Sequence, residues 1–383
     1  MAHLNIDQEP EIPFSRRFWE INWGLVLLIL AVASVGFLML TSVAGGDVDP
    51  WASRQLMRFG LGLALMLTIA MVDIKFWLRW AYLFYACALL ALLGVEVMGE
   101  IGMGARRWIA LGPFQFQPSE VMKLALVLAL ARYFHGLSYD DVGRLRWLVV
   151  PLVMVALPVM LVLRQPDLGT ALMIVAAAGL LFFAAGVRLW KFALVIVAVV
   201  SVMPVAWEML HGYQKQRVMT FLNPETDPLG SGYHILQSKI ALGSGGVFGK
   251  GYAQGTQSQL SFLPEKHTDF IFTTFAEEFG LAGAIGLLGL YGFVLAYGFA
   301  IGMRARNQFG RLVAFGVTCL LFIYVFINIA MVTGLVPVVG VPLPLVSYGG
   351  TSMMTLLAGF GLVLCVWVHR DAMVPRRAGQ MPD

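Results

Sequence analysis

Long apolar blocks alternate with short polar connections along almost the whole chain. A block of about 20 apolar residues is long enough to cross the hydrocarbon core of a bilayer as an α-helix. The pattern therefore predicts an all-α integral membrane protein with ten transmembrane helices. The predicted spans are Trp23–Ser42, Leu56–Val72, Trp80–Glu96, Glu120–Phe134, Trp147–Leu163, Leu168–Gly186, Trp190–Trp207, Phe279–Gly302, Leu312–Val332 and Ser352–Val368.

Two stretches interrupt this alternation. A polar segment, residues 209–268, separates the seventh and eighth spans, and it contains a short amphipathic helix predicted to begin near Ser231. The stretch "VPVVGVPLPLVSYGGTS", residues 336–352, is apolar but too rich in Pro and Gly for a regular helix. Non-helical backbone at membrane depth is tolerated only where protein or a water-filled cavity covers it. We therefore expect a broken re-entrant loop before the tenth span, with Asn328 as a polar neighbour.

Composition supports the membrane assignment and excludes other classes. Of 383 residues, 59% are hydrophobic and only 13% are charged, whereas soluble domains carry about a quarter charged residues. The basic residues are dispersed, so the net charge of +4 does not indicate nucleic-acid binding. Cys87, Cys319 and Cys365 fall inside apolar blocks and match no disulfide or metal spacing.

The placement of Lys and Arg predicts the orientation in the membrane. Fifteen of these residues fall in one set of loops and tails and six in the opposite set, outside the long loop. Basic residues favour the cytoplasmic side, so both termini, with tails 1–20 and 371–383, are predicted to be cytoplasmic. Residues 209–268 would then face outward. Because no nucleotide-activated donor is expected there, synthesis on that face would need a donor that is already activated, such as a lipid-linked one.

The stretch "FLPEKHTDFIFTTFAEEFG", residues 262–280, places many charges where the eighth span approaches the membrane. Asp269 permits two interpretations of equal weight. It could cap the eighth span, alone or with Thr268, or it could be a partly desolvated functional carboxylate. Glu277 and Glu278 point to different sides of a helix, so at least one should face a polar cavity or a partner.

Further charged residues allow both structural and functional roles. Glu120 and Lys123 are three apart, hence on one helix face, either as a structural ion pair or lining a cavity. Arg106 and Arg107 could extend to lipid headgroups or grip a pyrophosphate. Asp167 is more readily a helix cap or a partner of Arg164 than a functional group.

The glycine-rich stretch "GSGGVFGKGYAQG", residues 243–255, resembles a phosphate-binding loop only superficially. A P-loop would need Gly at Ser244 and Ser or Thr at Gly251, and Phe248 occupies the third glycine position of the dinucleotide fingerprint. We expect flexible or closely packed backbone instead. His234 and His267 have no spacing that specifies a metal site.

Four motifs in order along the chain resemble the SEDS family (shape, elongation, division and sporulation) of bacterial ten-span proteins, and its rod-shape branch in particular. The motifs are "GARRWIALGPFQFQPSEVMK", "QPDLGTALM", "LPEKHTDFIFTTFAEEFG" and "GLVPVVGVPLPLVSYGGTS". The resemblance covers nearly the whole chain. It implies a peptidoglycan glycosyltransferase of the cytoplasmic membrane that polymerises lipid II during cell elongation, with a class B penicillin-binding protein as its transpeptidase partner.

The resemblance also assigns roles to residues. Asp269 corresponds to the family's essential aspartate, which moves its interpretation towards catalysis, and Glu120 and Lys123 match the family's cavity motif. An inverting displacement on lipid II needs a base for the acceptor hydroxyl and positive charge on the departing pyrophosphate. A divalent cation, Mg²⁺ or Mn²⁺, could supply that charge. The basic candidates in the chain are Arg106, Arg107, Lys123, Lys215 and Arg217.

Two other classes of function stay open on the sequence alone. A lipid II flippase would suit the multispan body and the broken loop equally well, and it should depend on charges near the midplane. A scaffold without chemistry would act only through its partners. A polymerase should instead depend on Asp269 at the outer surface.

Overall fold

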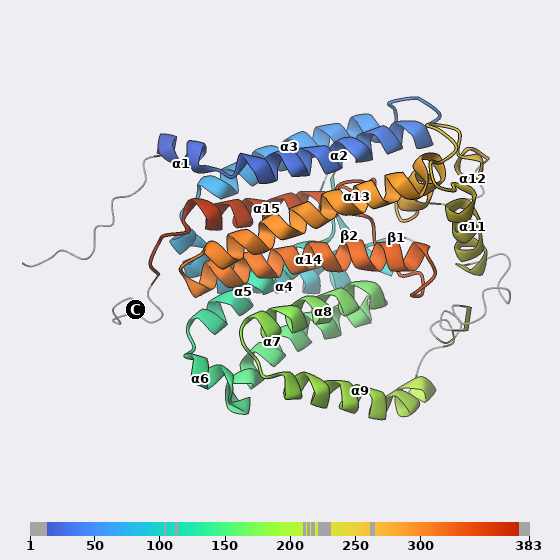
Figure 1. Ribbon diagram of the computed structural model, residues 1–383. Coiled ribbons are helices and arrows are strands. Elements are labelled where there is room, and N and C mark those ends of the chain that lie inside the picture. Colours follow the sequence, from blue (N-terminus) through green and yellow to red (C-terminus); the bar gives the residue numbers. More distant parts are fainter. Residues whose placement is uncertain are drawn as a thin grey trace, which may run out of the picture.

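The computed structural model describes residues 14–102, 105–111, 114–209, 212, 215, 219–220, 231–260 and 265–374, and shows them as a bundle of long helices (Figure 1). The long helices in these residues are α2 (Trp23–Val43), α3 (Trp51–Met71), α4 (Ile74–Met98), α5 (Pro118–His135), α7 (Leu145–Arg164), α8 (Leu168–Ala184), α9 (Leu189–Met209), α13 (Ile271–Arg304), α14 (Gln308–Val332) and α15 (Thr351–Val368). The short ones are α1 (Phe14–Glu20), α6 (Tyr139–Val142), α11 (Ser231–Ser244) and α12 (Thr256–Gln259).

Each predicted span coincides with one long helix, which confirms the all-α membrane class. Seven helices, α2, α3, α4, α7, α13, α14 and α15, are long and apolar enough to cross a bilayer. Residues Leu168–Ala184 of α8 and Leu189–Pro204 of α9 form shorter apolar helices. α5 carries Glu120, Lys123 and Arg132 within 18 residues. The count of ten crossings stays a prediction.

Several helices begin earlier than the hydropathy pattern indicated. The second starts at Trp51 rather than Leu56, the third at Ile74 rather than Trp80, and the eighth at Ile271 rather than Phe279. Their first turns carry polar and charged residues, which end an apolar run without ending a helix. Long basic side chains extend to the membrane surface while the backbone stays hydrogen-bonded within the helix.

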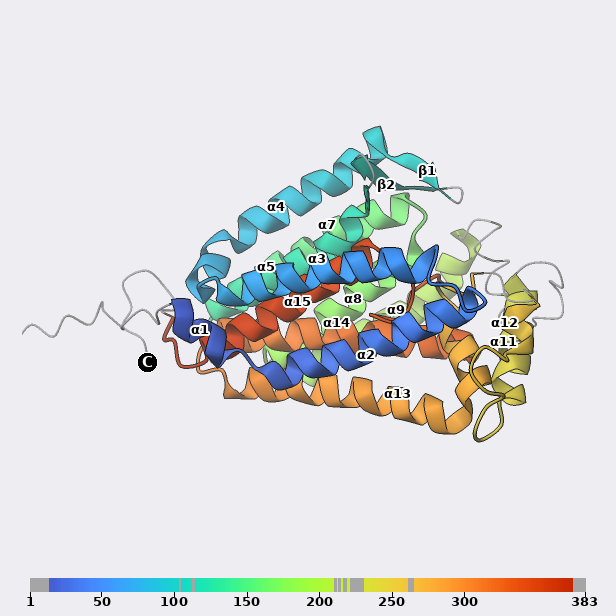
Figure 2. The same ribbon diagram turned by 90° about the horizontal axis from the view of Figure 1, so that it is seen from above.

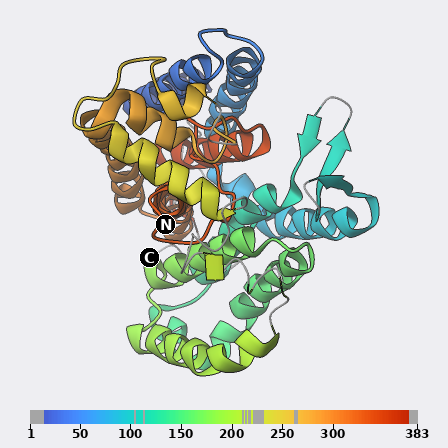
Figure 3. The same ribbon diagram turned by 90° about the vertical axis from the view of Figure 1, so that its right-hand side faces the viewer.

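The helices differ in how much protein surrounds them. In the most apolar window of α14, 72% of residues are buried, and in that of α15, 67%. The corresponding share for α4 is 22%. α14 and α15 therefore form the centre of the bundle, with α3 and α13 packed against them. α4 lies at its periphery, and α9 is set apart along one edge (Figures 1 and 3).

A small antiparallel sheet connects α4 to α5 and was not predicted. Its strands β1 (Glu100–Gly102), β2 (Ala105–Leu111) and β3 (Phe114–Phe116) pair in the order β1-β2-β3. The sheet projects from the side of the bundle at the end of α4 (Figures 2 and 3). The strands are too short for the alternation of apolar and polar residues to identify them from sequence.

The two ends of the bundle are different. At one end, α4, α7 and α14 finish and α5, α8, α13 and α15 begin, and α11 and α12 cover part of it (Figure 1). We call this the Asp269 end. α1 and the last turn of α15 lie at the opposite end (Figure 1).

The glycine-rich stretch docks against a break in α13, as closely packed backbone. Gly280 has φ 67° and ψ −166°, a conformation that interrupts α13 after Phe279. Lys250 N donates to Glu277 O at 3.0 Å, and Leu281 N donates to Gly246 O at 2.9 Å. The loop thus pairs with backbone on both sides of the break, which satisfies groups that the interrupted helix leaves free.

Glycine is required at this contact for steric reasons. A Cβ at Gly280 would lie 2.3 Å from Gly249 N, and a Cβ at Gly249 would lie 2.1 Å from Glu278 O. Both glycines also have positive φ, which side-chain-bearing residues rarely adopt.

Gly280→Ala should therefore destabilise the protein, whereas Gly286→Ala, in the same helix, should not. Backbone with φ 67° and ψ −166° is essentially restricted to glycine and costs about 1–3 kcal/mol for alanine, and the clash adds to this cost. A Cβ at Gly286 meets nothing within 4 Å, so alanine there should gain up to about 1 kcal/mol of helix propensity. Denaturation in mixed detergent micelles measures both changes. Equal stability of the two variants would contradict the role assigned to Gly280.

Candidate active site at the Asp269 end

The backbone that leads to Asp269 is held by three successive hydrogen bonds. Tyr348 N donates to His267 O at 2.8 Å, and Ser347 Oγ donates to Thr268 O at 2.6 Å. Asn328 Nδ2 donates to Asp269 O at 2.9 Å. The partners come from α14 and from the loop between α14 and α15. Asp269 is thus fixed by elements that follow it by more than 50 residues.

The loop between α14 and α15, residues 333–350, enters the bundle without helical structure, as predicted. Its backbone is paired by side chains: Asn328 Nδ2 donates to Val341 O at 2.7 Å, and Gln55 Nε2 donates to Ser347 O at 2.9 Å. Tyr291, deep in α13, donates to Pro344 O. These bonds satisfy backbone groups that would otherwise be unpaired at membrane depth.

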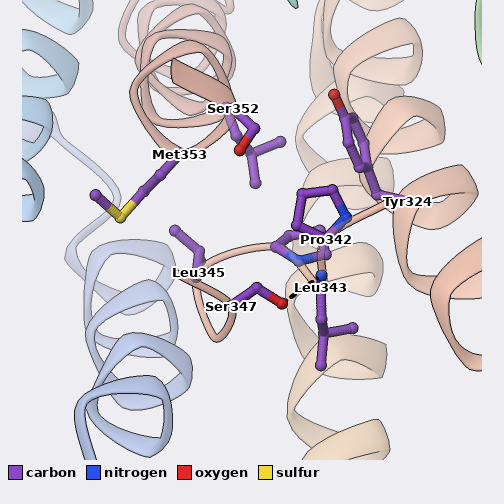
Figure 4. A pocket seen from close by; sticks show the side chains of 9 residues that line it. Tyr324, Pro342, Leu343, Leu345, Ser347, Ser352 and Met353 are labelled. Atoms are coloured by element: carbon purple, nitrogen blue, oxygen red, sulfur yellow. Dashed lines mark hydrogen bonds between the residues drawn. The ribbon is translucent and has the colours of Figure 1, made fainter. Parts of the chain in front are cut away.

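A small cavity of about 10 Å³ lies where this loop meets α14 and α15 (Figure 4). Tyr324, Pro342, Ser347 and Ser352 are among the residues that line it. Figure 4 shows the Ser347 hydroxyl turned towards the backbone of Leu343, whose N–H donates to it at 2.7 Å. The loop is therefore packed down to a space of about one water molecule.

The Asp269 carboxylate does not cap α13. The N-cap of α13 is Phe270, with no side-chain hydrogen bond, so the expectation that Thr268 or Asp269 caps this helix is wrong. No described residue donates a hydrogen bond to the carboxylate, and a Cβ at Gly340 would lie 3.4 Å from its Oδ2. Burial, reinforced by the nearby negative charge of Glu265, raises the pKa of Asp269 to about 6.

Glu120 and Lys123 form a buried pair on α5. Lys123 Nζ lies 2.7 Å from Glu120 Oε1, and the side chains are 8% (Glu120) and 3% (Lys123) exposed. The Tyr324 hydroxyl of α14 hydrogen-bonds to both groups, and Lys123 Nζ lies 4.4 Å from the Tyr324 ring centroid. The structural ion pair is therefore present. Tyr324, which binds both groups, lines the small cavity, whereas a cavity-lining role of Glu120 and Lys123 themselves stays a prediction.

One face of α14 connects this pair to Asp269. Tyr324 and Asn328 are four residues apart, so they lie one above the other on the helix. Tyr324 binds Glu120 and Lys123, while Asn328 binds the Asp269 carbonyl. The two residues of α14 that bind these predicted site features are thus about 6 Å apart along the helix.

Arg107 holds the turn between α7 and α8. Its guanidinium donates to Gln165 O at 3.2 Å and to Pro166 O at 2.6 Å, and Nε lies 3.7 Å from Asp167 Oδ2. Asp167 caps α8 by accepting from Thr170 N at 3.0 Å, as predicted. Its ion-pair partner is Arg107, so the alternative pairing with Arg164 is wrong.

The other predicted cations are less closely tied to the site. Arg106 belongs to β2, paired opposite Ile101 in β1. Lys215 contacts the end of α9: its Nζ lies 3.9 Å from Glu208 Oε2 and 5.9 Å from the Trp207 ring centroid. Arg217 lies outside the described residues.

Sequence reasoning missed a row of aromatic and cationic groups beside Asp269. The His267 ring stacks on Trp51 with centroids 4.7 Å apart, and it lies 5.9 Å from the Tyr348 ring. At the other end of this row, the Arg58 guanidinium lies over the Tyr348 ring, 5.1 Å from the ring centroid. Burial lowers the pKa of His267. Since the members come from α3, the approach to α13 and the loop before α15, no local motif could reveal the row.

Glu277 and Glu278 both have partners, on different sides of α13, as their adjacency indicated. Glu277 Oε1 lies 2.7 Å from Lys250 Nζ and accepts from Gln257 N at 3.1 Å. Glu278 Oε1 accepts from Ser42 Oγ of α2 at 2.5 Å. These carboxylates attach the start of α13 to the glycine-rich stretch and to α2.

The described part of the chain contains no group of three His, Cys, Asp or Glu side chains that could hold a metal ion. The residues around Asp269 therefore do not fit a resident cation held by protein side chains alone.

The fold and the site define a polytopic membrane protein with a partly desolvated carboxylate at one end of its bundle. The profile of the FtsW/RodA/SpoVE family, described as cell cycle proteins, matches residues 22–372. The chain is 43% identical to the peptidoglycan glycosyltransferase MrdB of Escherichia coli (strain K12), over 94% of this chain and 97% of that protein. It is 36% identical to stage V sporulation protein E of Bacillus subtilis (strain 168), over 90% and 96%.

Solved structures agree with the sequence relatives. The crystal structure of the rod shape determining protein RodA of Thermus thermophilus superposes with a TM-score of 0.69 at 33% identity, covering 91% of this chain and 97% of that one. A chain from work on "Structural coordination of polymerization and crosslinking by a peptidoglycan synthase complex" superposes with a TM-score of 0.80 at 36% identity, covering 91% and 98%. This protein belongs to the FtsW/RodA/SpoVE family, the SEDS family that its motifs resembled.

The buried pair on α5 makes a prediction about stability. Lys123→Met should leave the Glu120 carboxylate buried without its cation, which costs about 3–5 kcal/mol. The double variant Glu120→Gln/Lys123→Met removes both charges and should recover part of that loss. Denaturation in mixed detergent micelles gives the comparison. A double variant less stable than Lys123→Met alone would show that the pairing of charges is not what matters.

Proposed function

We propose that this protein is a peptidoglycan glycosyltransferase that polymerises lipid II into β-1,4-linked glycan strands, with Asp269 as the general base. The observation that carries the proposal is the Asp269 carboxylate itself. It is fixed through its backbone by Asn328, receives no hydrogen bond from a described residue, and has its pKa raised to about 6. A carboxylate with these properties is free to accept a proton from a substrate hydroxyl near neutral pH.

The reaction is one inverting displacement. The 4-hydroxyl oxygen of the acceptor sugar attacks the anomeric carbon of the donor, whose α-linked bond to pyrophosphate breaks. Asp269 takes the hydroxyl proton, and the polyprenyl pyrophosphate leaves with the bonding electron pair. Inversion converts the α-linked donor into a β-linked product, so no covalent enzyme intermediate is needed.

The departing pyrophosphate needs positive charge, which preorganised cations supply best. We assign this role to the predicted set: Arg106, Arg107, Lys123, Lys215 and Arg217. Within that set, Lys123 is buried against Glu120. Both side chains contact the Tyr324 hydroxyl, one helical turn from Asn328 on α14. Arg107 lies beside the turn that leads into α8. Gly169, in the first turn of α8, packs against the Val339 carbonyl. The next residue after Val339, Gly340, lies close to the Asp269 carboxylate.

The proposal includes an orientation and a partner. The Asp269 end, with residues 209–268, faces outward from the bacterial cytoplasmic membrane, and both termini are cytoplasmic. The excess of basic residues at the opposite end supports this. The partner is a class B penicillin-binding protein transpeptidase, in line with the resemblance to a chain from a peptidoglycan synthase complex.

Asp269→Asn should abolish the formation of glycan strands while the protein stays folded. Loss of a general base costs about 10²–10⁴ in rate. The assay follows labelled lipid II incubated with protein and its transpeptidase, with penicillin present to block crosslinking and the transpeptidase alone as background. The matched control is Asp371→Asn at the opposite end, an exposed carboxylate paired only with surface arginines. Strand formation by Asp269→Asn at the wild-type rate would remove Asp269 as the base. Translocation of lipid II in vesicles without any strands would favour a flippase.

The pH profile tests the state of Asp269. As the base, it acts in its ionised form, so the rate should rise about tenfold per pH unit below pH 6 and level off above it. Glu265→Gln removes a neighbouring negative charge, which should lower the pKa of Asp269 and move the midpoint to lower pH. Because Glu265 is exposed, the shift should be below about one unit. A midpoint that moves to higher pH in this variant would contradict the assignment.

A further inference from the structure

An apolar groove separates α4 from α7 on the periphery of the bundle, where the two helices run side by side (Figure 2). Its volume is about 510 Å³, and Leu89 and Leu93 line it from α4. Leu157 and Met160 line it from α7, and Arg164 closes it at the Asp269 end. A space of this size is within the range of small-molecule sites, about 300–1,000 Å³.

Two side-chain hydrogen bonds connect the helices at the two ends of the groove. Tyr85 OH donates to Met154 O at 2.8 Å, and Gln165 Nε2 donates to Leu92 O at 3.1 Å. On α4 these contacts are seven residues apart, or about 10 Å along the helix. Leu89 lies between them, and Leu93 lies next to the second contact. The helices are thus fixed relative to each other while the space between them stays open. The groove is therefore a fixed feature of this side of the bundle.

Arg164 supplies a charge at the end of the groove. The neighbouring carboxylate, Asp167, is engaged by Arg107 and by the start of α8. No described carboxylate lies within ion-pair distance of Arg164, whose side chain is exposed. An apolar groove that ends at an exposed guanidinium matches an anionic lipid, with an acyl chain along Leu89 and Leu93 and the phosphate on Arg164.

We propose that this groove binds one acyl chain of an anionic phospholipid, with the lipid phosphate on Arg164. The exposed Arg164 guanidinium complements an anionic phosphate, and the groove beside it holds one segment of an acyl chain over about 10 Å. The bound lipid fills the space between α4 and α7 and stabilises their contact.

The test uses full-length protein purified in detergent and incubated with phosphatidylglycerol or phosphatidylcholine. Native mass spectrometry counts the lipids retained as collision energy rises. We expect one phosphatidylglycerol to be retained at energies that remove phosphatidylcholine. Arg164→Gln should abolish that preference, and Met160→Trp, which fills the groove, should reduce retention several-fold. Val197→Trp, on an exposed position of α9, is the matched control and should behave as wild type.

Three results would overturn the proposal. They are equal retention of the two phospholipids by wild type, unchanged retention by both groove variants, and displacement of phosphatidylglycerol by a polyprenyl phosphate. Thermal unfolding gives a second readout: phosphatidylglycerol should raise the melting temperature of wild type more than that of Met160→Trp. Neither measurement involves lipid II or Asp269, so its outcome is separate from that of the proposed glycosyltransferase.

Discussion

Unpaired backbone groups cannot be left inside a membrane protein, and this constraint organises the centre of the structure. The loop of residues 333–350 is not a regular helix, so side chains pair part of its backbone: Gln55 from α3, Asn328 from α14 and Ser347 from the loop itself. Asn328 and Ser347 also bind the carbonyls of Asp269 and Thr268. The side chains that make a non-helical loop tolerable are therefore the ones that fix the candidate base.

Buried charges follow the same principle. Glu120 and Lys123 neutralise each other inside α5, and Glu277 is paired with Lys250 at the start of α13. Each pair joins two segments near the site. Tyr324 of α14 hydrogen-bonds to Glu120, and Lys250, the partner of Glu277, belongs to the glycine-rich stretch. Asp269 differs from them in having no such partner among the described residues, and burial, together with the nearby charge of Glu265, raises its pKa.

Sequence predicted the features that depend on local pattern. Apolar runs located all ten long helices, Pro and Gly identified the non-helical loop, and Ser231 marked the start of α11. What sequence could not give depends on partners far along the chain. The break at Gly280 is stabilised by residues near Gly246 that bond to it, and Asp167 pairs with Arg107 on β2 instead of Arg164 nearby. The position of Asp269 in the sequence left a helix cap and a functional carboxylate equally open, and only the family resemblance favoured the functional role.

The break at Gly280 also divides α13 into two parts with different contacts. After Gly280, α13 is a long span packed against α2 and α14. Before Gly280, the turns from Ile271 to Phe279 follow directly on Asp269 and are bonded to the loop around Lys250. Because the same loop also bonds to Leu281 and Ala282 after the break, it clamps the two parts of α13 together at Gly280. The turns that follow Asp269 are therefore held in place by this loop as well as by the membrane span.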